Sequence, residues 1–236
     1  MKFHHFLLAQ AIMLSVTACA YENHFLDDEE VDSSESTSYH TMEELNCADY
    51  SDWTYVNLQT GETETHPDAG EWIYSDGSLR EAQDPETVSI DWHIAIHRYE
   101  MKTNDATVCN TGLTDITAVT ELPSGTYTAD ETVTYEEELE KDEAGEASYL
   151  ISTDMSNMMS GVIGYAHNAT INRTISDGIT RTATGSMPPT IYGTTGETFA
   201  LKWEDGSWAK ILFTAVYSSS GSSGYLSFNY LYYPAQ

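Results

Sequence analysis

Half of the eight methionines in this 236-residue chain lie between residues 155 and 187. Met155, Met158 and Met159 stand in a polar segment that has no apolar stripe, and Met187 is followed directly by two prolines. Methionine usually fills gaps in a hydrophobic core, but neither segment has the pattern of a core element. A thioether is a soft, neutral donor that suits haem iron. Two thioethers from separate loops could therefore hold a porphyrin between them.

Side chains that flank these loops could complete a porphyrin site. Tyr165 and Tyr192 could pack against the macrocycle. Arg173 and Arg181 could pair with its propionates, in a chain that is otherwise short of cations. Soft donors stabilise the electron-richer metal, so a site with two thioethers should prefer ferrous over ferric haem.

The first 19 residues have the pattern of a secretory leader. An apolar run from Phe6 to Val16 is too short to span a bilayer, and small residues lead into Cys19. This ending resembles a bacterial lipobox, so we expect a lipoprotein whose mature chain begins at an acylated Cys19; a plain signal peptide is the alternative. Residues 20–45 are acidic and polar, which predicts a flexible tether. Residues 46–236 are expected to form one domain.

The charge of the chain excludes several classes of partner. The formal net charge is -29, from 38 acidic and 9 basic residues. Binding to phosphates needs Lys and Arg, so neither nucleic acid nor an anionic membrane surface is expected as a partner. Attachment to the membrane must then come from the lipid anchor. An acidic cluster shortly after the anchor resembles the export signal of some Gram-negative lipoproteins, which would place the domain on the outer membrane, facing the cell exterior.

Cys47 and Cys109 are the cysteines that follow the leader. An oxidising compartment permits a disulfide between them. Two separate buried thiols are an equal alternative.

The remaining motifs give little support to a bound metal ion or to catalysis. His93 and His97 are four residues apart in a period-two pattern, and on a strand this spacing separates them by about 13 Å. We therefore expect strand histidines, with His97 in a hydrogen-bond network beside Arg98. The sequence contains no nucleophile motif, no HExxH and no phosphate-binding glycine loop. We expect a protein that is not an enzyme.

The C-terminal third gives the clearest secondary-structure pattern. Apolar residues alternate over 199–203 and 209–217 with Asp205-Gly206 between them, which predicts a hairpin. A Ser/Gly run then leads to a third alternating segment, residues 226–232, so we expect a meander.

Shorter strands are predicted upstream, at residues 53–58, 90–97, 149–153 and 162–166. The longest helix-like stretch, residues 135–146, lacks an apolar face, so an exposed hairpin or loop is an equal alternative. Together these patterns predict an all-β domain, an antiparallel two-sheet sandwich or open barrel.

Several segments between residues 50 and 234 resemble one family, the HmuY-like haemophore lipoproteins of Gram-negative anaerobes. The most specific is the run Trp92-His93-Ile94-Ala95-Ile96-His97-Arg98-Tyr99. The others are residues 50–55 with the turn at 60–62, residues 208–213 and residues 226–230. The resemblance implies an all-β fold with projecting hairpin fingers that grip one haem. It also implies that haem is taken from host haemoproteins and handed to an outer-membrane haem transporter.

The resemblance also implies the axial ligands of the iron. The run Pro189-Thr190-Ile191-Tyr192 matches the family's sequence after the second ligand, which places that ligand at Met187. The first ligand falls in the upstream methionine segment, where Met158 is our choice and Met155 and Met159 are alternates. Histidine is absent from these positions, although the founding member has it at both, and His167 is the nearest histidine that could replace one methionine.

Two other classes of function compete with haem capture. A glycan-binding surface lipoprotein could use some of the 5 Trp and 16 Tyr as stacking platforms for sugars. A structural, adhesin-like module would instead show a sheet edge that pairs with another chain. Haem capture is the leading hypothesis.

Overall fold

The computed structural model describes residues 39–185 and 190–236. The leader with Cys19, residues 20–38 of the predicted tether, and Met187 lie outside these residues. Among the described residues, no helix is both long enough and apolar enough to cross a membrane.

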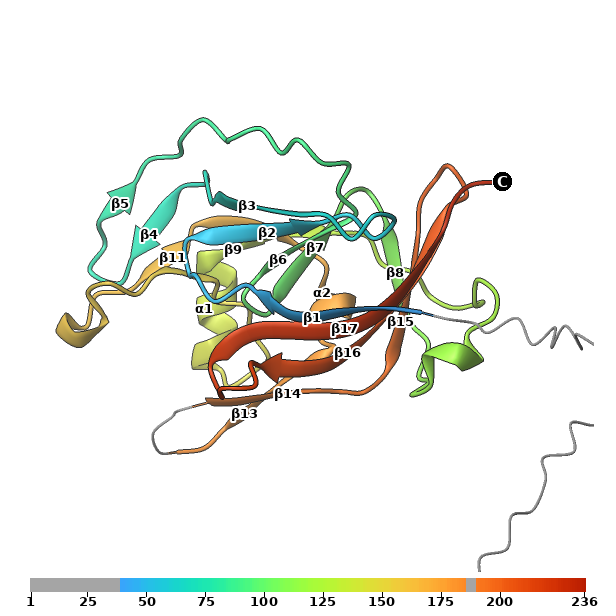
Figure 1. Ribbon diagram of the computed structural model, residues 1–236. Helices are drawn as coiled ribbons and strands as arrows, with labels where there is room; N and C mark the ends of the chain where they lie inside the picture. Colours follow the sequence, from blue (N-terminus) through green and yellow to red (C-terminus); the bar gives the residue numbers. More distant parts are fainter. Residues whose placement is uncertain (1–38, 186–189) are drawn as a thin grey trace, which may run out of the picture. The chain divides into compact units, whose positions relative to one another are not determined.

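A five-stranded antiparallel sheet forms one side of the domain (Figure 1). Its strands are, in spatial order, β1 (His40–Asn46), β17 (Ser223–Tyr233), β16 (Trp208–Tyr217), β15 (Thr198–Lys202) and β8 (Thr107–Asn110). The predicted meander of the C-terminal third is confirmed as β15, β16 and β17. At its first turn, Gly206 has a φ of +93°, a conformation that glycine adopts without strain.

The predicted tether is too long at its C-terminal end, because residues 40–45 belong to β1. This strand pairs with the edge of β17, from His40 opposite Tyr230 to Asn46 opposite Tyr225. Met42 and Leu45 pack against the hydrophobic core. The acidic pair Glu43-Glu44 hides the strand pattern, and the register shifts between Met42 and Leu45 to accommodate it.

A second antiparallel sheet covers the core from the other side. It contains β3 (Thr63–Pro67), β2 (Asp52–Val56), β6 (Ile94–His97) and β7 (Glu100–Thr103) in that order. Val56, Ile94 and Met101 of this sheet share one buried cluster with Phe213 and Phe228 of the first. Two facing sheets with a common core confirm the predicted all-β sandwich.

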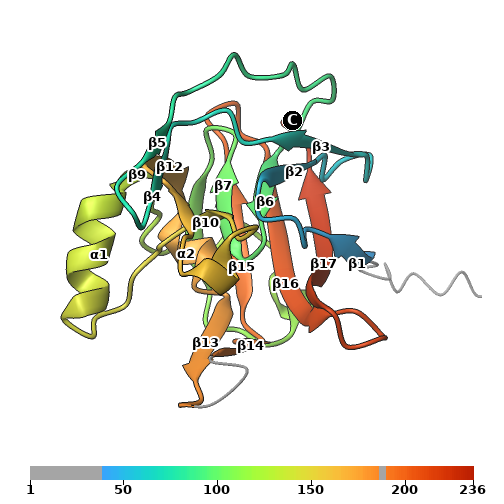
Figure 2. The ribbon, with the colours of Figure 1, turned by 90° about the vertical axis from the view of Figure 1, so that its left-hand side faces the viewer.

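Smaller sheets extend from this sandwich (Figures 1 and 2). One has the order β10 (Ser152–Asp154), β11 (Gly164–Ala166), β4 (Trp72–Tyr74) and β5 (Leu79–Arg80). Two further pairs are β12 (Asn168–Ile171) with β9 (Glu131–Thr134), and β13 (Ile179–Ala183) with β14 (Thr190–Thr194).

The acidic stretch after β9 is a helix, α1 (Tyr135–Glu143), which decides between the two alternatives for residues 135–146. Thr134 caps it by accepting a hydrogen bond from the Glu137 backbone N–H at 3.3 Å. Acidic residues in its first turn complement the helix dipole. Short helical turns complete the fold as η1 (Ile116–Ala118), η2 (Met158–Ser160) and α2 (Arg173–Ser176).

Cys47 and Cys109 are both free thiols and both buried. Cys47 belongs to the central core cluster, whereas Cys109 lies on β8 at an edge of the large sheet. The structure therefore has separate thiols, the second of the two alternatives.

Candidate functional site

The upstream methionines lie at the tip of a hairpin formed by β10 and β11. Asp154 starts the tip, where its carboxylate accepts a hydrogen bond from the Ser156 backbone N–H at 2.8 Å. The 3-10 turn η2 follows, and it ends at Gly161, whose φ of +79° lets its N–H reach the Met158 carbonyl at 2.9 Å. The tip is thus a closed loop with its own hydrogen bonds.

The methionines of this tip differ in exposure. Met159 is 94% exposed and Met158 is 48% exposed, while Met155 is half-buried at the base of the tip. Exposure on this scale excludes gap filling in the core as the role of Met158 and Met159. Their thioethers are accessible to a ligand.

The β10–β11 hairpin is fixed to strand β4 and to the turn after it. The Tyr74 hydroxyl donates to the Asp154 carboxylate at 3.1 Å. Ser75 Oγ donates to the Gly161 carbonyl at 3.0 Å and accepts from the Ile163 backbone N–H at 3.1 Å. These contacts hold the methionine tip from the side and reduce the conformational entropy that a ligand would have to remove.

A second hairpin is formed by β13 and β14, with Arg181 opposite Tyr192. Its root is fixed to the turn between β6 and β7. The Tyr192 ring stacks on Tyr99, and Arg181 donates to the Glu100 carboxylate at 3.0 Å. The tip of this hairpin, with Met187, is outside the described residues.

The two hairpins project from the same side of the domain (Figures 1 and 2). In Figure 1 both lie at the lower left, and in Figure 2 both come toward the viewer. The chain therefore places the exposed methionines of the first hairpin on the side to which β13 and β14 extend.

The arginines expected near haem propionates already have carboxylate partners. Burial opposes the charge of Arg173, but hydrogen bonds to Glu138 and Glu131 outweigh it and raise the pKa of Arg173. Arg181 is half-buried, and the charge of Glu100 raises its pKa in spite of that partial burial. Either arginine would have to share its charge with a second anion in order to meet a propionate.

The two expected tyrosines lie at the hairpins, each with one ring neighbour. Tyr165 is half-buried on β11, and its ring tilts against Tyr135 of α1 with centroids 5.2 Å apart. Tyr192 has one face covered by Tyr99.

The histidines are engaged in the fold. His97 Nε2 hydrogen-bonds to the Tyr50 carbonyl at 2.6 Å, which agrees with the predicted structural role. Both ring nitrogens of His167 contact carboxylates, those of Glu71 and Glu136, and these hydrogen bonds raise its pKa. Within residues 39–185 and 190–236, no cluster of His, Cys, Asp and Glu has the size of a metal site.

Sequence reasoning missed a cavity of about 340 Å³ at the base of the first hairpin. Met155, Trp72 and Tyr50 contribute to its wall. Thr153 also lines it, with a buried hydroxyl that has no hydrogen-bond partner in the described chain. Met155 belongs to the methionine segment and Tyr50 to a segment that resembles the family, but no local pattern marks Trp72 or Thr153 or brings these residues together.

Comparisons with known proteins agree on one family. Residues 49–230 match the family model described as HmuY protein. An HmuY analogue of Tannerella forsythia, solved in its apo form, is 31% identical with a TM-score of 0.67, over 84% of this chain and 96% of that chain. No curated protein matches the sequence.

Two solved structures from Bacteroides species share the same fold. A candidate HmuY-like heme binding protein of Bacteroides vulgatus is 27% identical with a TM-score of 0.62, over 85% of this chain and 94% of that one. A candidate lipoprotein of Bacteroides fragilis is 26% identical with a TM-score of 0.62, over 86% and 92% of the two chains.

Proposed function

This chain belongs to the HmuY family of haem-binding proteins, and on that premise we propose that it is a haemophore that captures haem without catalysing a reaction. The observation that carries the proposal is the placement of exposed methionines on a braced hairpin, on the side to which β13 and β14 extend. Met187, on the loop between β13 and β14, would supply the opposing thioether.

The proposed axial ligands are Met158 and Met187. Met158 is accessible, and the Gly161 N–H that closes on its carbonyl fixes its backbone. Met159 is more exposed but lies one residue further around η2, and Met155 is half-buried, so these two remain the alternates. Two neutral thioethers would bind ferrous haem more tightly than ferric haem, since soft donors favour the electron-richer iron.

The proposed location rests on the lipobox-like pattern at Cys19. An acylated Cys19 would anchor the protein in the outer membrane, and residues 20–39 would serve as a tether ahead of β1. On the cell surface the domain could take haem from host haemoproteins and pass it to an outer-membrane transporter. A Cys19→Ala variant should leave the membrane fraction, and protease added to intact cells should cleave the wild-type protein.

A haem titration tests the proposed function. The purified domain should give a sharp low-spin spectrum with haem and dithionite, and no spectral change would end the proposal. Met158→Leu and Met187→Leu keep the volume but remove the sulfur, and each should weaken binding by about tenfold or more, because even loss of a ligand's supporting contacts costs that much. Met42→Leu, at a packed position on β1, is the matched control. Unchanged spectra in both ligand variants would overturn the assignment of the ligands but not the proposal that the protein binds haem.

A further inference from the structure

A cleft of about 940 Å³ is lined by residues outside the two hairpins, among them His93, Trp203 and Tyr232. The turn between β15 and β16, which borders this cleft, lies at the upper right of Figure 1, whereas the two hairpins lie at the lower left. The cleft lies between the residues that precede β6, the turn after β7 and the turn between β15 and β16. Haem capture by the hairpins leaves this cleft without a role.

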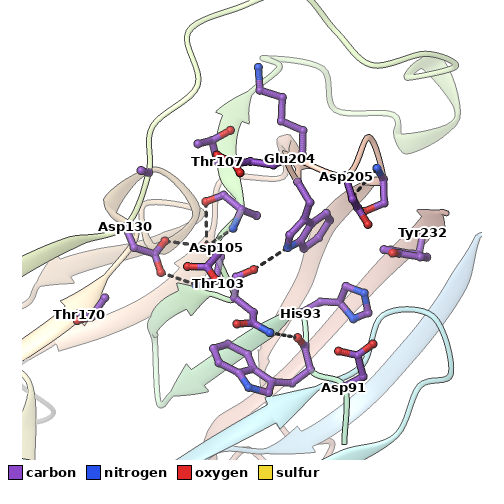
Figure 3. A pocket seen from close by; sticks show the side chains of 17 residues that line it. Asp91, His93, Thr103, Asp105, Thr107, Asp130, Thr170, Glu204, Asp205 and Tyr232 are labelled. Atoms are coloured by element: carbon purple, nitrogen blue, oxygen red, sulfur yellow. Dashed lines mark hydrogen bonds between the residues drawn. The ribbon is translucent and has the colours of Figure 1, made fainter. Parts of the chain in front are cut away.

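His93 supplies a hydrogen-bond donor with a fixed direction at the wall of this cleft (Figure 3). The ring is 7% exposed, and its Nδ1 accepts a hydrogen bond from the Leu58 backbone N–H at 3.2 Å. The neutral ring must therefore carry its proton on Nε2. Burial lowers the pKa of His93, which keeps the ring neutral near pH 7. Nε2 has no hydrogen-bond partner in the described part of the chain.

Aromatic rings form the wall next to His93. The His93 ring centroid lies 4.5 Å from that of Tyr232 and 5.2 Å from that of Trp203, both in edge-to-face arrangements. Asn104 fixes the orientation of Trp203, because its backbone carbonyl accepts the indole N–H at 2.8 Å. Trp203 and Tyr232 are each only partly buried, so apolar ring surface faces the cleft.

Carboxylates supply hydrogen-bond acceptors around these rings (Figure 3). Asp91, Asp105 and Glu204 are exposed at the rim. Asp205 uses one oxygen to accept from the Ser207 N–H and hydroxyl, at 2.9 and 2.6 Å, which leaves its other oxygen available. By contrast, Asp130 is occupied by hydrogen bonds from Thr103 and Asn172 within the fold.

We infer that this cleft binds a neutral carbohydrate, with a sugar ring against Trp203 and Tyr232, hydroxyls donating to Asp91 and Asp205, and one hydroxyl oxygen accepting from His93 Nε2. Sugar hydroxyls both donate and accept, and the C–H face of a sugar is apolar, so a saccharide matches all three kinds of group. A cation would leave the His93 donor without an acceptor. An anion would be repelled by the rim carboxylates.

Glycan binding by the purified domain tests this inference. An array of neutral, sialylated and sulfated oligosaccharides, with spermine and poly-lysine as cationic probes in parallel titrations, should give binding to neutral glycans and none to the anionic ones, whereas the acidic chain attracts the cations whatever the cleft binds. A response to the cations alone, or to no glycan, would overturn the inference. Haem is left out of these assays, so their outcome is independent of the hairpin site.

Paired variants locate the site. Trp203→Leu should weaken binding of the selected glycan by about tenfold or more, since it removes a stacking surface. Trp208→Leu is the matched control, because Trp208 stacks on Tyr233 and does not line the cleft. Asp91→Asn should also weaken binding, and because Asp91 is exposed the variant should fold normally. Equal binding by wild type, Trp203→Leu and Asp91→Asn would place the glycan elsewhere and overturn the inference.

Discussion

Tyr99 and Tyr192 lie face to face, with ring centroids 4.0 Å apart and planes inclined by 25°. Tyr99 follows Arg98, which has a φ of +52° in the tight turn between β6 and β7, whereas Tyr192 belongs to β14. The stack therefore fixes the root of the second hairpin to the central sandwich. The Tyr192 backbone N–H also donates to the Tyr217 hydroxyl at 3.2 Å.

Replacing Tyr192 by leucine removes this stack but keeps the backbone hydrogen bond. We expect the free energy of unfolding to fall by about 1–2 kcal/mol, as is usual when a packed aromatic pair is lost. Haem affinity should fall as well, because a looser hairpin must be ordered on binding. Urea denaturation and haem titration measure the two effects. Tyr39→Leu, at a 41% exposed position, should change neither.

A histidine series identifies the upstream ligand. Imidazole is a harder donor than a thioether, so histidine at the ligand position should lower the reduction potential of the bound haem and favour the ferric form. We expect this change for Met158→His and not for Met159→His, which serves as the control on the same turn. A lowered potential in Met159→His alone would transfer the assignment to that residue.

Glu138 is a buried carboxylate whose loss should destabilise the fold. It accepts hydrogen bonds from Arg173 and Lys141, each at 2.5 Å, and from the Tyr149 backbone N–H at 2.6 Å. Glu138→Ala should cost about 3 kcal/mol, since it leaves the buried Tyr149 N–H and two half-buried cations without their acceptor. Glu140→Ala, at an exposed position of the same helix, should stay within about 0.5 kcal/mol of the wild type in urea denaturation.

The same carboxylate should make stability sensitive to acid. Burial alone would raise the pKa of Glu138, but its hydrogen bonds to Arg173 and Lys141 hold it below the ordinary value of 4.5. A depressed pKa contributes stability above 4.5 that is lost as the pH falls through the folded-state value. The Tm difference between wild type and Glu138→Gln should therefore narrow below that pH. A constant difference across the acid range would contradict this explanation.

The two buried cysteines should behave as separate thiols. Burial raises the pKa of Cys47 to about 12, in spite of the Thr54 hydrogen bond and the charge of Arg98. A leaderless domain should thus resist a thiol reagent at pH 8 while folded. In denaturant without reductant, both Cys47 and Cys109 should react. Failure of either to react there would indicate a disulfide.

The sequence patterns predicted a strand best where one face of that strand is buried and the other is exposed. The alternation of β17 could be read directly because every second residue of that strand is buried, whereas β15 is buried on both faces and was marked by its apolar residues and the turn that follows it. The strand predicted for residues 90–97 is shorter, and β6 begins only at Ile94. The chain before it turns into the cleft wall, where His93 N donates to the Val56 carbonyl at 2.8 Å.

Elements that depend on distant partners could not be predicted in this way. The helix α1 has no apolar face, and its one buried side chain, Glu138, pairs with Arg173 from a separate helix. Such an ion pair leaves no periodic trace in the sequence. The strand β1 was not predicted either, because the charged residues Glu43 and Glu44 interrupt its pairing with β17 and its apolar alternation.

For the candidate site too, local features could be predicted from the sequence, whereas contacts between distant residues could not. The absence of an apolar stripe around Met158 correctly indicated an accessible side chain. The contacts that brace the hairpins, such as Arg181 with Glu100 and Ser75 with Gly161, join residues from different strands or turns. Sequence spacing does not encode them, and a tertiary structure was needed to find them.

The solvent exposure of Met158 and Met159 makes their thioethers susceptible to oxidation. A thioether that iron can reach can also be reached by peroxide, which converts it to a sulfoxide. A sulfoxide presents oxygen rather than sulfur to a metal and is far more polar. Brief treatment of the domain with hydrogen peroxide should therefore abolish its affinity for ferrous haem, and methionine sulfoxide reductases should restore it. A protein built on these sulfurs suits surroundings that are poor in oxygen.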